Sequence, residues 1–94
     1  MYSYVFSYNP DKLKKRTVFD FLNECEEVAA WLSPFAGTVI VISNSSAEDL
    51  SELFSDEFGE ANHLFVDIQD DEPDYQGWLD EEAWDYINSP DDYE

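Results

Sequence analysis

The sequence predicts one α+β domain, a two-layer ferredoxin-like sandwich in the order β-α-β-(β)-α-β followed by a C-terminal helix. Residues 2–8 alternate between two kinds of side chain, residues 38–42 and 64–68 are apolar runs, and helical spacing lies between them. A parallel three-layer fold needs more strands than 94 residues supply. We assign residues 1–87 to the domain and residues 88–94 to a flexible acidic tail.

The first strand is expected over residues 2–8. One face carries the small residues Ser3, Val5 and Ser7, and the other is aromatic, which is the period of two that a strand requires. The aromatic face consists of Tyr2, Tyr4, Phe6 and Tyr8. The strand is expected to end at residues 9–11, because proline removes a ladder donor and Asn and Asp favour turns.

A long helix is expected from Thr17 to Leu32, with Thr17 as its N-cap. Its apolar residues follow the spacing of one helix face: Val18, Phe21, Leu22, Cys25, Val28, Ala29 and Leu32. The opposite face carries Asp20, Glu24, Glu26 and Glu27. Pro34 and Gly37 follow as breakers, and an extra short strand near residues 31–35 is left open.

The second half of the chain is expected to contain two further helices. Ser45 or Ser46 caps the first of them, and Gly59 ends it. Its buried residues are Leu50, Leu53, Phe54 and Phe58. After the strand at 64–68 and an acidic loop at 70–74, a shorter helix follows. Its inner side holds Trp78, Leu79, Ala83, Trp84 and Ile87.

The charge of the chain limits its partners. It has 23 acidic residues against four Lys or Arg, for a net charge of −19. A field of this sign repels nucleic acid and anionic lipid and attracts basic surfaces. An apolar content of 44% favours a compact globule over a disordered acidic chain. The single cysteine, with no secretory signal or long apolar run, predicts a cytoplasmic protein.

The basic residues form one cluster, Lys12, Lys14, Lys15 and Arg16. A cluster of this kind is one way to bind phosphate groups. The surrounding negative charge instead favours a solvated loop whose cations lie against neighbouring carboxylates. The sequence therefore predicts no direct contact with nucleic acid.

Five short segments occur in the same order as in SinR-family proteins. They are Tyr-Val-Phe-Ser-Tyr-Asn at 4–9, Ala30-Trp31 with Pro34, Ser-Ala-Glu-Asp-Leu at 46–50, Leu-Phe-Val-Asp-Ile at 64–68 and Gly-Trp-Leu at 77–79. The chain resembles this family over most of its length. The resemblance implies a ferredoxin-like fold similar to that of the nucleases of CRISPR adaptation. Those nucleases use an aspartate for metal where this chain has Asn9, so the resemblance argues against nuclease chemistry here.

No catalytic group is predicted. His63, the only histidine, is expected at the surface or a strand edge, and Cys25 is expected in the core. The loop starting at Asp70 has the ligand spacing of a calcium-binding EF-hand, but Tyr75 replaces the glycine that the turn requires. We therefore expect no enzyme activity, no cofactor and no dedicated metal site.

Acidic residues gather on the last two helices and on the loop between them. Acids three and four apart lie about 6 Å from one another on one side of a helix. Such like charges destabilise a helix by a few tenths of a kcal/mol per pair, and no lysine offsets them. We predict a partner-binding surface of Glu48, Asp49, Glu52, Asp56, Glu57, Glu60, Asp70, Asp71, Glu72, Asp74, Asp80, Glu81, Glu82 and Asp85.

Spaced carboxylates on a rigid scaffold resemble a nucleic-acid backbone. We therefore expect a DNA-mimic inhibitor, encoded by a phage and directed against a CRISPR or restriction system. Its partner would be a basic nucleic-acid-binding protein, with no nucleic acid or membrane bound directly. A homodimer is compatible with this hypothesis, because the second face of a four-stranded sheet needs cover.

Three alternatives stay open. The first is an accessory or immunity protein of a defence or toxin locus, which would neutralise one basic partner by nearly the same physics. The second is a metal-dependent nuclease, which only the family resemblance suggests. The third is a domain adapted to high salt, against which the aromatic content of 17% argues.

Overall fold

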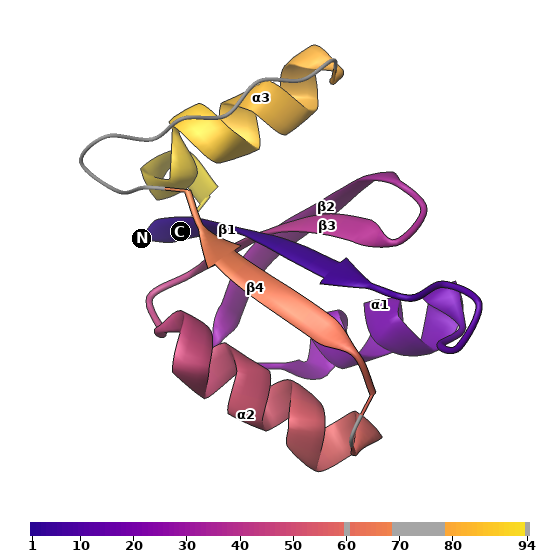
Figure 1. Cartoon of the computed structure of the whole chain (residues 1–94). Helices are drawn as coiled ribbons and strands as arrows, with labels where there is room; N and C mark the ends of the chain where they lie inside the picture. Colours follow the sequence, from indigo (N-terminus) through magenta and orange to yellow (C-terminus); the bar gives the residue numbers. More distant parts are fainter. Residues whose placement is uncertain (60, 69–78, 94) are drawn as a thin grey trace.

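The computed structural model describes residues 1–59, 61–68 and 79–93. Its elements are β1 (Tyr2–Tyr8), α1 (Lys15–Glu24), β2 (Val28–Phe35), β3 (Thr38–Ser43), α2 (Ala47–Phe58), β4 (His63–Asp67), α3 (Glu81–Asn88) and the 3₁₀ helix η1 (Pro90–Tyr93). The strands form an antiparallel sheet in the order β2-β3-β1-β4. α1 and α2 lie against one face of the sheet and α3 lies against the other (Figure 1). The predicted α+β fold, consistent with a ferredoxin-like sandwich, is confirmed.

The central strand β1 supplies the middle of the main core. Tyr4, Phe6 and Tyr8 point toward α1 and α2 and are buried, as the alternation predicts, whereas Tyr2 at the strand start is exposed. β1 pairs with β3 on one side and with β4 on the other, so that Phe6 lies opposite both Val39 and Phe65. The aromatic face of the first strand therefore anchors the sheet to its helical layer.

The other face of the sheet binds α3 through a smaller core. Ile40, Ile68, Ala83 and Ile87 are its buried members. Ser3 is fully buried beneath the end of α3, and its hydroxyl donates to the backbone oxygen of Tyr86 at 2.9 Å. The last four carbonyls of a helix have no partner within the helix. The Ser3 hydroxyl therefore caps the end of α3 while holding it on the sheet.

The predicted helix from Thr17 to Leu32 is wrong in its second half. α1 ends at Glu24, its N-cap is Lys14 rather than Thr17, and β2 occupies Val28–Phe35. The apolar run in β2 fits strand spacing as well as helical spacing, and pairing with β3 decides between them. None of the helices in the described ranges is long and apolar enough to cross a bilayer.

The C-terminal residues differ from the tail expected over 88–94. α3 continues to Asn88, and η1 forms over Pro90–Tyr93 with the Pro90 side chain buried. The N-terminal ammonium group lies 3.0 Å from the carboxylate of Asp91. The two ends of the described chain therefore meet, and regular structure extends beyond residue 87.

Gly37 permits the tight turn between β2 and β3. Its φ is +84°, and a Cβ there would lie 3.1 Å from the backbone oxygen of Tyr8 and 3.2 Å from Pro10. We expect Gly37→Ala to lower the free energy of unfolding by about 1–2 kcal/mol, measured by urea denaturation. Gly59→Ala is the control, because φ is +71° there and nothing lies within 4 Å of the added Cβ. Equal losses in the two variants would contradict a role for the close approach to Tyr8.

Ser3→Ala should loosen α3 from the sheet. Loss of the hydroxyl removes the hydrogen bond from a fully buried side chain to the backbone oxygen of Tyr86, so the free energy of unfolding should fall by about 1 kcal/mol. Amide hydrogen exchange should accelerate in α3 before it does in β3. Ser7→Ala, on the same face of β1 but only half-buried, should leave both quantities nearly unchanged. An equal effect of the two substitutions would rule out the capping role.

Candidate acidic binding site

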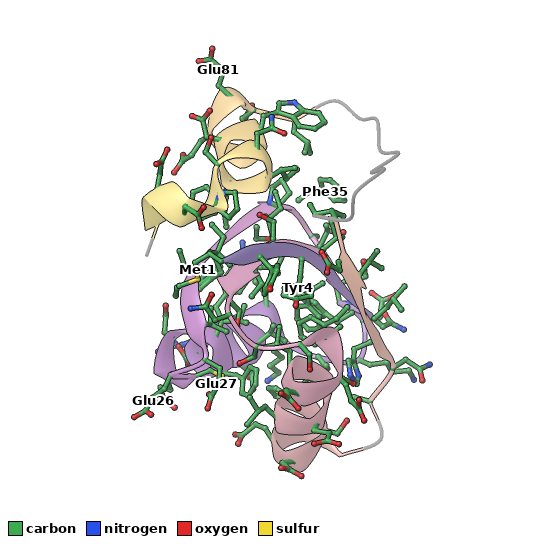
Figure 2. The ribbon with its side chains drawn as sticks, turned by 90° about the vertical axis from the view of Figure 1, so that its left-hand side faces the viewer. Met1, Tyr4, Glu26, Glu27, Phe35 and Glu81 are labelled. Atoms are coloured by element: carbon green, nitrogen blue, oxygen red, sulfur yellow. The ribbon has the colours of Figure 1, made fainter. Side chains whose placement is uncertain are left out.

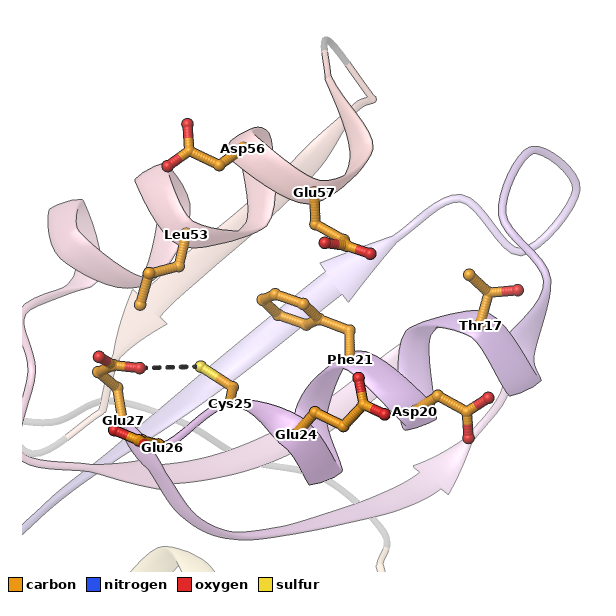
Figure 3. A pocket seen from close by; sticks show the side chains of 10 residues that line it. All are labelled: Thr17, Asp20, Phe21, Glu24, Cys25, Glu26, Glu27, Leu53, Asp56 and Glu57. Atoms are coloured by element: carbon orange, nitrogen blue, oxygen red, sulfur yellow. Dashed lines mark hydrogen bonds between the residues drawn. The ribbon is translucent and has the colours of Figure 1, made fainter.

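A groove of about 600 Å³ lies between α1 and α2 on the outer side of the helical layer (Figure 3). Its carboxylates are Asp20 and Glu24 of α1, Glu26 and Glu27 of the following turn, and Asp56 and Glu57 of α2. Phe21, Cys25 and Leu53 lie between the two acidic rows and provide an apolar floor (Figure 3). The groove therefore offers negative charge at its walls and carbon surface at its base.

A second hollow extends this groove along α2. It has a volume of about 340 Å³ and shares Glu27, Leu53 and Asp56 with the first. Asp49 and Glu52 contribute two further carboxylates. The two hollows form one continuous strip, which we call the acidic groove, along the side of α2 that faces α1.

The burial pattern of α1 sets the direction of its acids. Val18 and Leu22 are four residues apart and are buried against the sheet. Asp20 and Glu24 are also four residues apart, and both are exposed along the groove. The sheet-facing stripe of the helix therefore fixes a carboxylate on each turn of its outer side.

The acids of α2 have two different energetic roles. The Ser46 hydroxyl accepts a hydrogen bond from the backbone nitrogen of Asp49 at 3.1 Å and caps the helix, as predicted. Glu48 and Asp49 lie in the first turn, where the positive end of the helix dipole favours them. Asp56 and Glu57 lie near the negative end, where no basic residue is present in the last turn. Helix stability therefore explains the first pair of acids but opposes the second.

The groove carboxylates are not neutralised by cations of the described chain. The ion pair recorded within 4.0 Å among the described residues joins the N-terminus to Asp91. Lys15 instead places its ammonium group 5.5 Å from the centre of the Phe19 ring. The expected pairing of the basic loop with neighbouring carboxylates is thus not found in the part of the chain that the structure describes.

Cys25 is not the core residue that the sequence predicted, but the C-cap of α1 at the floor of the groove. Its thiol donates a hydrogen bond to Glu27 over 3.3 Å (Figure 3). Burial raises the pKa of the Cys25 thiol, and the hydrogen bond and negative charge of Glu27 raise it further. The thiol is therefore protonated at neutral pH and is a poor nucleophile.

The structure divides the acids that the sequence had placed on one surface. Asp49, Glu52, Asp56 and Glu57 line the acidic groove, and Glu48 lies exposed in the first turn of α2. Asp80, Glu81, Glu82 and Asp85 lie at α3, on the opposite face of the sheet. Figure 2 places Glu81 at one end of the molecule, far from Glu26 and Glu27 at the other. Glu60, Asp70, Asp71, Glu72 and Asp74 lie outside the described residues, as does most of the EF-hand-like loop.

Half of the groove was absent from the predicted surface. Asp20, Glu24, Glu26 and Glu27 face α2, although the sequence analysis noted them only as the polar side of a longer helix. The separations of four residues from Asp20 to Glu24 and of three from Glu24 to Glu27 were a usable signal. That α1 and α2 lie side by side could not be predicted from the sequence, because the adjacency of two helices depends on the order of the strands in the sheet.

His63 forms a pair with Ser51 that sequence analysis did not find. Its Nε2 lies 2.7 Å from the Ser51 hydroxyl, and its Nδ1 lies 2.9 Å from the backbone oxygen of Ala61. A carbonyl can only accept, so Nδ1 donates to Ala61, and in the neutral ring Nε2 accepts from the Ser51 hydroxyl. The imidazole also packs on the Phe54 ring at 4.5 Å between centroids. The pair therefore links α2 to β4. Its two residues are twelve positions apart, so no local sequence motif predicts that they meet.

Asn9, the residue that follows β1, has a local role. Its side-chain oxygen accepts a hydrogen bond from the backbone nitrogen of Asp11 at 2.9 Å, which closes the turn after β1. Within the described ranges, no group of three or more His, Cys, Asp or Glu residues is arranged to hold a metal ion. The acids here are spread along a surface rather than converging on a point.

Comparisons with protein-family models, with curated proteins and with solved structures find no match for this chain. The functional argument therefore depends on the geometry and charge of the acidic groove.

Neutralising Asp56 and Glu57 should stabilise the fold at low salt. The double variant D56N/E57Q removes two charges from the unfavourable end of α2, whereas E48Q/D49N removes two from the favourable end. We expect the first variant to exceed the second in free energy of unfolding by about 1 kcal/mol in about 20 mM salt. The difference should shrink in about 500 mM salt, where charges are screened. Identical urea unfolding curves for the two variants would show that only net charge matters.

Proposed function

We propose that this chain is a non-enzymatic DNA mimic, which binds the nucleic-acid-binding surface of a basic protein and so inhibits it. One observation carries the proposal. Eight carboxylates, on two neighbouring helices and on the turn that follows α1, line a continuous groove, and none is ion-paired to a cation of the described chain. Two of them, Asp56 and Glu57, oppose the stability of the helix that bears them. Binding of an external cationic surface accounts for acids that stability does not.

The charge density of the molecule matches that of duplex DNA. The longest dimension of the chain is 31 Å, and its net charge is −19. A duplex carries one charge per about 1.7 Å of axis, so 31 Å of duplex carries about 18 charges. The molecule as a whole thus has a charge and a length comparable to those of such a duplex, and the acidic groove presents eight of its carboxylates to a cationic cleft.

The apolar floor of the groove suits the side chains that bind DNA. Arginine and lysine combine a cationic head with an aliphatic stem, which can lie on apolar surface. Phe21 and Leu53 offer that surface, and Glu24 and Glu57 flank it with carboxylates. This arrangement supports recognition of a basic protein rather than of a free metal ion or a neutral ligand.

A target in host defence, such as a CRISPR effector or a restriction enzyme, agrees with this chemistry, because such proteins present basic DNA-binding clefts. An immunity or accessory protein that neutralises one basic partner would use the same groove. A domain adapted to high salt would not use the acidic groove for binding, and such a domain would unfold in dilute buffer.

Competition with DNA tests the proposal. The full chain is added to complexes of labelled duplex with purified restriction enzymes and CRISPR effectors, and DNA release is followed by fluorescence anisotropy. We expect release by at least one of these proteins, together with an inhibition constant that weakens steeply with added salt. Failure to displace DNA from any of them, or unfolding of the chain in dilute buffer by circular dichroism, would overturn the proposal.

A matched pair of variants separates the groove from net charge. The variant D20N/E24Q/D56N/E57Q neutralises four groove acids, and D80N/E81Q/E82Q/D85N neutralises four acids at α3. Both variants carry a net charge four units less negative. We expect the groove variant to weaken inhibition at least about tenfold more than the α3 variant. Equal weakening would mean that binding follows total charge and not the acidic groove.

A further inference from the structure

Phe21 is the aromatic side chain among the described residues that line the acidic groove. Its ring meets Phe54 at 5.7 Å and Phe58 at 5.5 Å between centroids, at interplanar angles of 90° and 69°. These two partners lie on successive turns of α2, so they hold the ring in place between the two helices. The side chain is only half-buried, and it forms part of the groove floor (Figure 3). The groove therefore presents a π surface in a fixed position.

Two exposed carboxylates lie beside this ring. Glu24 follows Phe21 by three residues, which places both side chains on the same side of α1. Glu57 approaches from α2, where it precedes Phe58. Figure 3 shows the Phe21 ring between these two acids, and neither forms an ion pair within the described chain. An aromatic ring flanked in this way suits a flat cation that stacks on the ring and donates hydrogen bonds from its edges.

The other aromatic residue of α1, Phe19, shows how such a ring behaves when a cation of the chain can reach it. The ammonium group of Lys15, one helical turn earlier, lies 5.5 Å from the centre of the Phe19 ring. This distance is within the limit of about 6 Å for a cation–π interaction. Phe19 lies on the flank of α1 toward β2, where it packs on Trp31. Phe21 is surrounded by carboxylates, and no cation of the described chain is recorded over its ring.

We propose that the acidic groove selects arginine over lysine, with the guanidinium of a partner arginine stacked on Phe21 and hydrogen-bonded to Glu24 and Glu57. A guanidinium is planar and has five N–H donors in a fixed fork, so it can contact the ring and both carboxylates together. A lysine ammonium is a compact and strongly hydrated charge, which makes neither the stacked nor the bidentate contact. Leu53 and Cys25 provide carbon and sulfur surface on the same floor for the aliphatic stem of the arginine.

This inference rests on the proposed function, because the arginine would belong to the DNA-binding surface of the basic partner. Arginine is also the residue that binds phosphate groups in the bidentate manner. An arginine held in the groove is therefore unavailable to DNA. Partners that bind DNA mainly through arginine should consequently be inhibited more strongly than those that rely on lysine.

Peptide binding tests the selectivity. Labelled oligo-arginine and oligo-lysine peptides of equal length are titrated with the full chain in about 150 mM salt, and binding is followed by fluorescence anisotropy. We expect the arginine peptide to bind at least about fivefold more tightly. Phe21→Leu keeps an apolar side chain but removes the ring, so it should lower this ratio at least about threefold. Phe19→Leu, on the other flank of α1, is the control and should preserve the ratio.

A pair of acid variants locates the arginine within the groove without altering the aromatic core. E24Q/E57Q neutralises the two acids beside Phe21, whereas D49N/E52Q removes the same charge from the second hollow. Both variants should weaken the binding of both peptides, because both lose negative charge. We expect the ratio of the two affinities to fall at least about twofold in E24Q/E57Q and to persist in D49N/E52Q. Circular dichroism would verify that each variant is folded.

The outcomes separate this inference from the proposed function. Equal affinity of the unmodified chain for the two peptides would overturn the arginine selectivity, as would a ratio that stays the same in E24Q/E57Q and in folded Phe21→Leu. The proposed function would survive either result if the chain still released DNA from a basic protein. Failure both to bind the peptides and to release DNA would overturn the two together.

Discussion

The packing of the Phe6 ring is the contact on which the rest of the structure depends. Phe6 is fully buried at the middle of the central strand, stacked on Phe65 at 4.5 Å and edge-on to Phe54 at 5.0 Å. These contacts join β1, β4 and α2 into one unit. A chain with a net charge of −19 repels itself in the compact state, so apolar burial has to supply the opposing free energy. Aromatic rings supply it well, because each buries a large apolar area.

The same core determines where the charges are presented. Burial of Leu50 and Phe54 on one side of α2, and of Val18 and Leu22 on one side of α1, directs the remaining positions of both helices outward. The two helices lie side by side on one face of the sheet, so their outward acids share one groove. The packed framework holds the helix backbones that carry these carboxylates, so a cationic surface that bound them would order little additional backbone. Rigidity is thus the feature that separates this molecule from an acidic disordered chain.

The hydrophobic pattern of the sequence correctly predicted those strands in which each face has the same degree of burial along its whole length. β1 alternates cleanly because one face meets the aromatic core and the other meets α3, and β3 reads as a continuous apolar run because both its faces are covered. The run Val28–Leu32 misled because it satisfies both helical and strand spacing, and only pairing with β3 resolves it. The acids of α2 were likewise visible from spacing, whereas their neighbours Glu24 and Glu27 were not assigned to the same site. Which helices are adjacent depends on strand order, and single-sequence periodicity carries no information on it.

α2 brings these consequences together, because its two flanks differ in chemistry. The flank toward α1 carries Asp49, Asp56 and Glu57. The flank toward β4 carries Ser51 and Ser55, with Glu48 three residues before Ser51 on the same side. A helix that only needed to be soluble would spread its charge over both flanks, since like charges on one side repel. Concentrating most of its acids on the groove side raises that repulsion. The distribution therefore makes the flank toward α1 the more negative side of the helix. The acidic groove is therefore the side of α2 at which we propose that a cationic protein binds.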